Sequence, residues 1–370
     1  MKFQVKNSAL QEVLQTAITA VPNKSTLPIL NNFSLRLEGN TLEICATDLN
    51  LGVRTKLEVQ GERDGEAVIN ARKFSDIFKA LDSSIETISV DVQDYLAKIK
   101  WSERGQASIR SFDADEFPPL PEVEGTTLSF APSELAFLVE KTAFAVSNDS
   151  TRQNLNGIFL EAVDGTVSMV ATDGHRMGRA SIEQEGTTLP KGIIIQSKIL
   201  QQVLRIAKSN AAIEVCANDT FIIFNTGATQ IISKLYEGPY PNYRAVIPQN
   251  FERTVQANTA ELQSKVRSIL PMATDMSHRI RFQMDGNVME LSATDPDVGG
   301  ECRDAMAITH SGEGSFSIGL NGQYLAEILK MCNSEELVIK MNNPIGACVI
   351  EPVCEDLRYS FLLMPLRLTE

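Results

Sequence analysis

Asp173 and His175 lie two residues apart in the segment ATDGHRMG, where the chain has its most suggestive pair of side chains for chemistry. An aspartate and a histidine at this spacing can be two metal ligands or half of a catalytic dyad. No third ligand is evident beside them in the sequence, and the other two histidines, His278 and His310, have no comparable setting. We therefore favour a histidine in a surface loop. A hydrolase centred on Asp173 and His175 is the alternative.

Other signatures of catalysis are missing from the sequence. It contains no P-loop, dinucleotide-binding glycine fingerprint, nucleophile elbow or HExxH motif. The glycine-rich stretch that begins at Gly312 is typical of a turn that leads into a strand. Ser315 within it has no catalytic base close by in the sequence. Six cysteines are scattered without a CxxC pair, which is typical of reduced thiols rather than a disulfide or zinc framework. We expect no catalytic residue, no metal and no cofactor.

The tripeptide Ala-Thr-Asp occurs three times, ending at Asp48, Asp173 and Asp295, which are 125 and 122 residues apart. Each copy ends an apolar, strand-like run that follows a turn signal. The three turn signals are Gly39-Asn40, Asp164-Gly165 and Asp285-Gly286-Asn287. Aspartate commonly begins a turn at the end of a strand. We therefore predict a structural role for these residues in three separate domains, rather than one acidic cluster.

Two helical segments recur with the same period. Segments with helical spacing of apolar residues follow the hairpins, from Ala71, Gln196 and Asn321. Other helix candidates precede the hairpins and begin near Ser8, Ser133 and Thr259, which could cap them. The unit is α+β, and its recurrence predicts three tandem copies of one domain. We place their boundaries at residues 1–125, 126–250 and 251–370.

The charge of the chain is unevenly distributed. The net charge of −13 would ordinarily argue against a nucleic-acid partner. Yet residues 191–208 carry Lys191, Lys198, Arg205 and Lys208 without an acid, and residues 67–81 also carry a net positive charge. Two solvated helix faces would explain this pattern. The other interpretation is a basic surface on equivalent helices, suited to weak and sequence-independent phosphate contacts.

The start MKFQVKNSAL lacks the apolar centre of a signal peptide. No run approaches the roughly 20 apolar residues of a membrane span. We expect a cytoplasmic protein without a membrane partner.

The order of several motifs resembles one protein family over the whole chain. The second repeat contains ATDGHR and ends with LYEGPYPNYRAVIP, and MPLRL lies near the C-terminus. Leu27–Leu30 (LPIL) and Arg152–Gly157 (RQNLNG) fit as well. This pattern resembles the bacterial DNA polymerase III beta subunits, the sliding clamps. The resemblance implies three DNA-clamp domains per chain and a head-to-tail homodimer that closes six domains into a ring around duplex DNA. It also implies a processivity factor without catalysis. A monomeric peptide-binding scaffold is the alternative.

The resemblance also implies two sets of contact residues for the ring. Side chains facing the DNA would be Lys24, Arg72, Lys73, Arg152, Lys198 and Arg205. At the dimer interface, Ile269 and Leu270 of one copy would pack against Ala107 and Ile109 of the other.

A third implied site is a hydrophobic cleft between the second and third domains. It would bind short linear peptides of the DNA polymerase III catalytic subunit, the clamp loader, other polymerases and repair proteins. The implied residues are Leu155, Thr172, Gly174, His175, Arg176, Met177, Pro241, Val246, Asn321, Tyr324, Ile345, Ala347, Leu362, Met364, Pro365, Leu366 and Arg367. Apolar walls with a few polar groups suit a peptide anchor, and methionine adapts to varied ligands.

Overall fold

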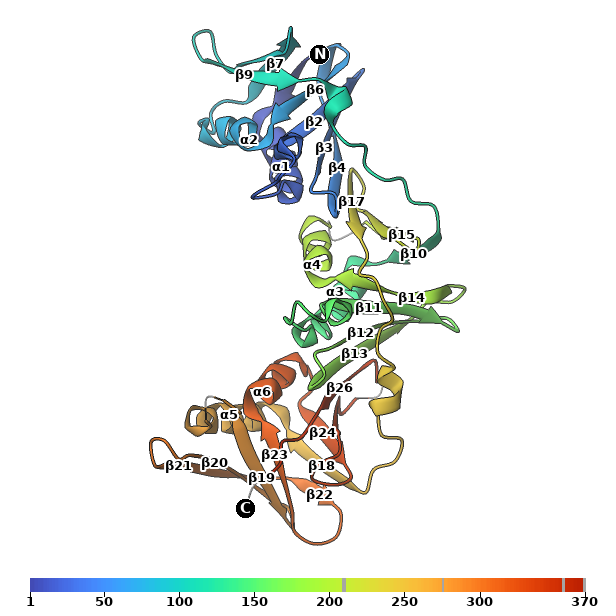
Figure 1. Cartoon of the computed structure of the whole chain (residues 1–370). Helices are drawn as coiled ribbons and strands as arrows, with labels where there is room; N and C mark the ends of the chain where they lie inside the picture. The colour runs from blue at the N-terminus through green and yellow to red at the C-terminus, as the bar shows by residue number, and fades with distance from the viewer. Residues whose placement is uncertain (208–210, 275, 355–356, 369–370) are drawn as a thin grey trace. The chain divides into compact units, whose positions relative to one another are not determined.

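One order of elements is repeated three times along the chain (Figure 1). The computed structural model describes residues 1–207, 211–274, 276–354 and 357–368, so Lys208 lies outside the described residues. Each repeat is a strand, a helix, four strands, a second helix and three strands, with β5 (Gln60–Arg63) and β22 (Thr309–Ser311) as additions. The prediction of three tandem α+β domains is confirmed.

The bounds of the elements show how regular the repeat is. Repeat one contains β1 (Lys2–Lys6), α1 (Asn7–Ala17), β2 (Asn32–Glu38), β3 (Thr41–Thr47), β4 (Leu51–Glu58), β6 (Gly65–Asn70), α2 (Ala71–Ala80), β7 (Thr87–Gln93), β8 (Leu96–Lys100) and β9 (Gln106–Phe112). Repeat two contains β10 (Thr126–Phe130), α3 (Pro132–Glu140), β11 (Gly157–Val163), β12 (Thr166–Thr172), β13 (Arg176–Glu183), β14 (Leu189–Gln196), α4 (Ser197–Ile206), β15 (Ile213–Ala217), β16 (Phe221–Asn225) and β17 (Thr229–Lys234). Repeat three contains β18 (Arg253–Asn258), α5 (Thr259–Ile269), β19 (Arg279–Asp285), β20 (Val288–Asp295), β21 (Gly300–Ala307), β23 (Phe316–Asn321), α6 (Gly322–Met331), β24 (Glu336–Met341), β25 (Cys348–Pro352) and β26 (Tyr359–Leu363).

Three of the helices are capped by asparagine, and for α5 this corrects the expectation of a threonine cap. Asn70, Asn258 and Asn321 precede α2, α5 and α6, and each side chain accepts a hydrogen bond from the third backbone N–H of its helix. Thr259 is already the first residue of α5, while α1 follows Lys6 without a side-chain cap. Asparagine caps well because its short amide reaches an N–H that has no partner inside the helix.

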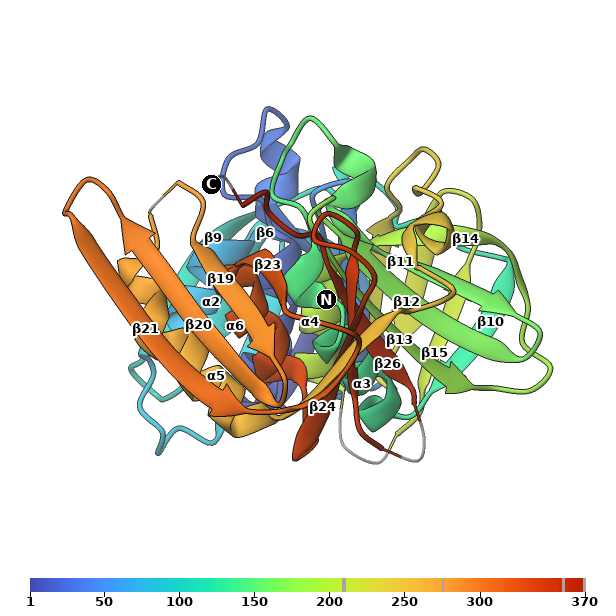
Figure 2. The ribbon, with the colours of Figure 1, turned by 90° about the horizontal axis from the view of Figure 1, so that it is seen from below.

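The chain divides into two compact units. Residues 1–133 and 198–235 form the first, and residues 134–197 and 236–370 form the second. The first unit is built on a 13-stranded sheet, and α1, α2 and α4 lie on one side of it (Figure 1). The second unit contains a nine-stranded and a four-stranded sheet. In repeat three, α5 and α6 lie against one face of the four-stranded sheet (Figure 2), and the helices and strands of both sheets share one apolar core.

Pairing between repeats follows one rule, and we call each such pairing a joint. The last strand of a repeat pairs antiparallel with the third of the four successive strands of the preceding repeat. At the first joint β17 pairs with β4, and at the second β26 pairs with β13. The two strand edges that complete the rule are open in the described chain. Residues 106–110 of β9 pair with β8 alone, and β21 pairs with β20 along one edge.

Polar side chains add to each joint. At the first joint the hydroxyls of Thr55 and Thr229 hydrogen-bond at 2.8 Å in a buried setting. At the second joint the fully buried Lys141, just after α3, donates to the carbonyl of Met331 at 2.7 Å. That carbonyl is at the C-terminal end of α6, where a cation is favoured by the helix dipole. None of the helices in the described ranges has the length and hydrophobicity needed to cross a membrane.

The buried threonine pair gives a test of the first joint. We expect Thr229→Val to cost about 1–3 kcal/mol of unfolding free energy, because it leaves the Thr55 hydroxyl buried without its partner. The double variant Thr55→Val/Thr229→Val should recover most of that loss, since both polar groups are then gone. Urea unfolding of the two single variants and the double variant measures both values. Simple additivity of the single losses would contradict a coupled pair.

Candidate functional site

Each Ala-Thr-Asp sequence lies at the end of a strand and its aspartate begins a turn, as predicted. The Asp48 carboxylate accepts the backbone N–H of Asn50 at 2.9 Å, and Asp173 accepts that of His175 at 2.9 Å. Asp295 accepts the N–H of Asp297 at 2.9 Å. The three aspartates thus stabilise equivalent turns in three repeats.

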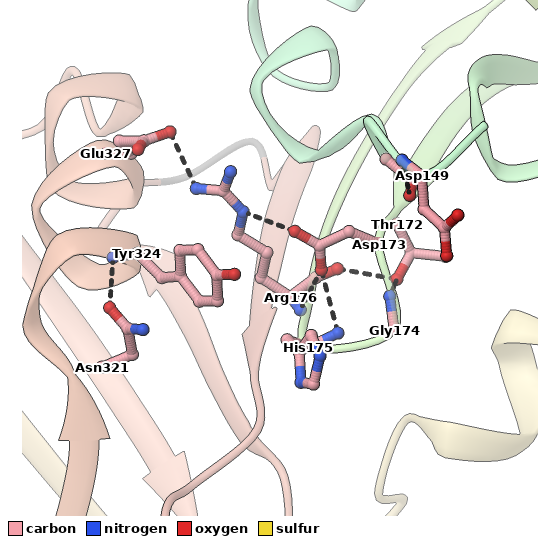
Figure 3. A network of polar contacts seen from close by, with 10 residues as sticks. Asp149, Thr172, Asp173, Gly174, His175, Arg176, Asn321, Tyr324 and Glu327 are labelled. Carbon is pink, nitrogen blue, oxygen red and sulfur yellow. Dashed lines mark hydrogen bonds and ion pairs between the residues drawn. The ribbon is translucent and has the colours of Figure 1, made fainter. Parts of the chain in front are cut away.

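In the second repeat this turn also contributes to contacts with the third repeat. Arg176 begins β13, and its side chain is 9% exposed. Its guanidinium pairs with Asp173 at 3.1 Å and with Glu327 of α6 at 2.8 Å (Figure 3). The guanidinium carbon lies 4.3 Å from the ring centre of Tyr324 and 5.4 Å from that of Phe144. A buried cation is tolerated because both carboxylates and the ring faces replace its lost water.

Next to this network, residues of repeats two and three lie side by side. The rings of His175 and Tyr324 are stacked with centroids 6.4 Å apart. Asn321, the cap of α6, accepts the backbone N–H of Tyr324 at 3.0 Å (Figure 3). The carbonyl of His175 accepts the N–H of Met364 at 2.8 Å, just after β26. Four residues implied by the resemblance therefore lie together at the second joint.

A small apolar cluster lies at the same joint, and we call it the joint cluster. Its buried members are Val170, Met177, Tyr243 and Leu362, with Phe159, Tyr240, Ile247, Ala347 and Met364 packed against them. These residues come from β11, β12, β13, the segment 236–250 that links repeats two and three, the end of the 342–347 loop, and the C-terminal segment. Strands from two repeats and the linker thus bury one set of apolar side chains together.

The linker is anchored to β11 by two tyrosines. The ring of Tyr240 stacks on Phe159, with centroids 4.7 Å apart and planes 8° from parallel. The hydroxyl of the buried Tyr243 donates to Glu161 at 2.5 Å, and Arg244 donates to the same carboxylate oxygen at 2.6 Å. Burial raises the pKa of Tyr243 to about 12, and its hydrogen bond to Glu161 adds to the shift. The phenol therefore keeps its proton and its donor role at neutral pH.

Exposed apolar groups flank the joint cluster in sequence. Val246 of the linker is 53% exposed, Ile345 is 67% exposed, and Pro241 is exposed too. Leu155 is buried, which favours a core role for it. In the C-terminal segment, Leu366 donates its N–H to Gly319 at 2.8 Å, and Pro365 and Leu366 are half-buried. Of the remaining implied residues, Thr172 and Gly174 form the turn that precedes β13, and Arg367 is exposed.

The residues implied for DNA contact are exposed side chains. Lys24, Arg72, Lys73, Lys198 and Arg205 all belong to the first unit and are all exposed. Gln202 of α4 hydrogen-bonds to Thr19, just after α1, so that α4 is tied to the helices of repeat one.

Arg152 belongs to the second unit and pairs with Asp149 at 3.0 Å. It also lies beside the Asp173 turn, because a Cβ on Gly174 would be 3.5 Å from its guanidinium. A phosphate would have to compete with Asp149 for it.

The residues implied for the dimer interface differ in accessibility. Ala107 and Ile109 are half-buried, and they lie on the same face of β9 at its open edge, between exposed residues. Leu270 is also half-buried and packs at the margin of the repeat-three core. Ile269, in contrast, is fully buried in that core, so it can support Leu270 but offers no surface of its own.

The geometry argues against the hydrolase alternative. The Asp173 carboxylate is occupied by the turn and by Arg176, and His175 stacks on Tyr324 instead of facing that carboxylate with its ring. Among the described residues, no three or more His, Cys, Asp and Glu side chains are grouped to hold a metal. Burial raises the pKa of the Cys45, Cys332 and Cys348 thiols to about 12, which leaves them protonated and poorly nucleophilic.

Several residues of this site were not singled out from the sequence. Glu327 is paired with Arg176 across 151 positions, and Tyr243 meets Glu161 across 82. A signal for Glu161 exists, since it is a charged residue in the apolar strand sequence GIFLEAV. A buried acid predicts a nearby partner, although the sequence does not say which one.

Three family models match successive parts of the chain. They describe the N-terminal domain of the DNA polymerase III beta subunit over residues 1–121, the central domain over 129–242 and the C-terminal domain over 244–367. The beta sliding clamp of Vibrio cholerae is 29% identical, with all of both chains covered. The crystal structure of the DNA polymerase III subunit beta from Pseudomonas aeruginosa superposes with a TM-score of 0.92 at 26% identity, again over both whole chains. A Bartonella birtlesii sliding clamp bound to griselimycin gives a TM-score of 0.91 at 26% identity, also over both whole chains.

The Arg176 network predicts a large effect of one substitution. We expect Arg176→Met to cost about 3–5 kcal/mol of unfolding free energy, because Asp173 and Glu327 lose a buried partner. As a matched control, Arg303→Met removes an arginine that is 61% exposed and paired with Glu301, which should cost under about 1 kcal/mol. Urea denaturation of both variants measures the difference. Equal losses would show that Arg176 contributes no more than a surface ion pair.

Proposed function

The chain belongs to the DNA polymerase III beta subunit family and is a DNA sliding clamp, and from this premise we propose that two copies close head to tail into a ring around duplex DNA. The ring would tether the replicative polymerase and so raise its effective concentration at the primer end. We assign residues 1–125, 126–250 and 251–370 to the three domains of each copy.

The joint rule carries the proposal of a ring. At each joint the last strand of one repeat pairs with the third of the four successive strands of the preceding repeat. The chain contains two such joints. Among the described residues, the free edge of β9 at residues 106–110 and the outer edge of β21 would be the two halves of a third such joint. Pairing β9 of each copy with β21 of the other would close six repeats and cover both edges.

We assign the inner surface of the ring to the exposed basic side chains of repeats one and two. The side chains that would contact phosphates are Lys24, Arg72, Lys73, Lys198 and Arg205. Arg152 would join them where a phosphate displaces Asp149 from its guanidinium. A few such contacts give weak, salt-sensitive binding without sequence preference, which allows sliding. The remaining acidic surface of a chain with net charge −13 would disfavour DNA on the outside.

We assign partner binding to the surface around the joint cluster. Exposed Val246 and Ile345, the adaptable Met364 and the polar groups of His175 and Asn321 provide an apolar surface with a few polar contacts. Peptides of the DNA polymerase III catalytic subunit, the clamp loader, other polymerases and repair proteins would bind there in turn. The protein would catalyse no reaction and would work in the cytoplasm, where the chromosome is replicated.

Topological binding gives a direct test of this function. We expect fluorescent protein, loaded onto nicked plasmid by a clamp loader, to remain with the DNA through gel filtration at moderate salt. Cutting the plasmid once should release most of it, because a ring slides off free ends. A plasmid that lacks the restriction site controls for effects of the nuclease. Equal retention on circular and linear DNA would contradict enclosure and favour a simple binding protein.

The partner surface can be tested with exposed apolar side chains. We expect Ile345→Ser and Val246→Ser each to weaken a peptide about tenfold, since an apolar contact is lost, with unchanged unfolding free energy. The probe is the tightest binder in an overlapping set of labelled peptides that spans the polymerase III catalytic subunit, measured by fluorescence anisotropy. Val288→Ser is the matched control, because Val288 is 51% exposed on β20. An affinity loss in the control as large as in the two variants would refute the assignment.

A further inference from the structure

We propose that Glu161 is a positioning residue for the partner surface, because it holds the linker between repeats two and three in the conformation that binds peptides. This inference rests on the proposed peptide function. Glu161 itself belongs to β11 and is buried, so it acts through Tyr243 and Arg244 rather than by touching the peptide.

The first step of the argument is the placement of a carboxylate inside a sheet. Glu161 lies within β11 and is 7% exposed, with Leu160 and Ala162 buried on either side. A buried carboxylate is costly unless it is hydrogen-bonded and paired with a cation. Both needs are met from the linker, by the phenol of Tyr243 at 2.5 Å and the guanidinium of Arg244 at 2.6 Å. The acid is therefore stable in this position when the linker is docked.

The second step is the local character of the backbone hydrogen bonds in the turn from Pro241 to Val246. The start of the linker is attached differently, because the N–H of Tyr236 donates to the carbonyl of Ile194 in β14 and the amide of Asn154 donates to that of Pro239. The N–H of Tyr243 donates to Pro241 at 2.7 Å and that of Ala245 to Asn242 at 3.2 Å, so these bonds shape the turn without attaching it to a sheet. Between residues 240 and 247 the attachment to the sheet comes from side chains: Tyr240 stacks on Phe159, and Tyr243 and Arg244 donate to Glu161. A short turn that is attached through side chains moves when such an attachment is removed.

The third step connects this attachment with the partner surface. Tyr243 reaches Glu161 with its hydroxyl and forms part of the joint cluster with its ring, beside Met177 and Leu362. Val246 lies three residues further on, at the end of the same short helical turn, Tyr243–Val246. The position of Tyr243 thus sets both the packing of the cluster and the place of an exposed anchor.

Loss of the Glu161 charge should therefore release the linker and lower affinity without removing any peptide contact. A ligand that needs one conformation binds more weakly in proportion to the fraction of molecules that lack it. The measured loss of affinity should accordingly follow the opening of the linker. Replacing a residue that only stabilises the fold would lower the free energy of global unfolding, and the loss of affinity would not follow the opening of the linker.

The experiment compares Glu161→Gln, Tyr243→Phe and the control Asp91→Asn, which removes the charge of a carboxylate paired with Arg63 at 2.6 Å in the first unit. Hydrogen–deuterium exchange of residues 237–247 is measured in the free protein, and anisotropy gives the affinity for the labelled polymerase peptide. We expect Glu161→Gln to speed exchange in this segment and to weaken the peptide about tenfold. Tyr243→Phe should have a smaller effect on both, and Asp91→Asn none.

Two outcomes would overturn the inference while the proposed function stands. In the first, Glu161→Gln leaves exchange of residues 237–247 unchanged. In the second, exchange rises but the peptide binds with wild-type affinity. If the wild-type protein binds no peptide of the set, the proposed partner surface fails, and the positioning role falls with it. Retention of the wild-type protein on circular DNA is independent of all three outcomes.

Discussion

Antiparallel pairing between strands of successive repeats is the interaction on which the rest of the structure depends. It occurs at β4 with β17 and at β13 with β26, so both sheets that cross a repeat boundary are continuous. Every residue in such a pairing satisfies backbone groups that would otherwise be exposed along an edge. The same geometry requires two open edges in a chain of three repeats, and in the described part of the chain residues 106–110 of β9 and the outer edge of β21 provide them. The proposed ring would thus follow from repeating one joint and would need no separate kind of interface.

The two joints within the chain are alike in backbone and different in side chains. The first has the two threonine hydroxyls and a hydrogen bond from Arg54 to Gln230. The second has the buried cations Arg176 and Lys141, the His175–Tyr324 stack and the joint cluster. Ionic groups in a buried joint favour one arrangement of the repeats, since in another arrangement Arg176 would lose Glu327 and Lys141 would lose the carbonyl of Met331. A fixed arrangement suits a surface that is assembled from both repeats and the linker. Asp173 itself therefore has a structural role in its turn. Its neighbours His175 and Arg176 connect that turn to the third repeat, beside the proposed partner surface.

Much of the fold could be predicted from the sequence, because hairpins and helices are encoded by short-range periodicity. The turn at Asp173 and the helix from Ala71 are examples, and both are confirmed. The pairing of β26 with β13 could not be predicted from periodicity. Any half-buried strand shows the same alternation of apolar and polar residues, which does not identify the strand it pairs with. The Arg176–Glu327 pair has the same difficulty, since 151 residues separate the two. Resemblance to a family supplied the candidate surface, but the buried role of Arg176 emerged from the structure.

The central claim is that the third joint forms between two copies, and site-directed cross-linking tests it most directly. Cys302 already lies on the open β21 edge and is half-buried, and Ala107→Cys places a second thiol on the open edge of β9. A short bifunctional maleimide should convert this variant into a denaturation-resistant species of twice the 40.7 kDa chain mass. Adding Cys302→Ser should abolish that species. A product that stays at the mass of one chain, or that forms equally without Cys302, would contradict closure through these edges.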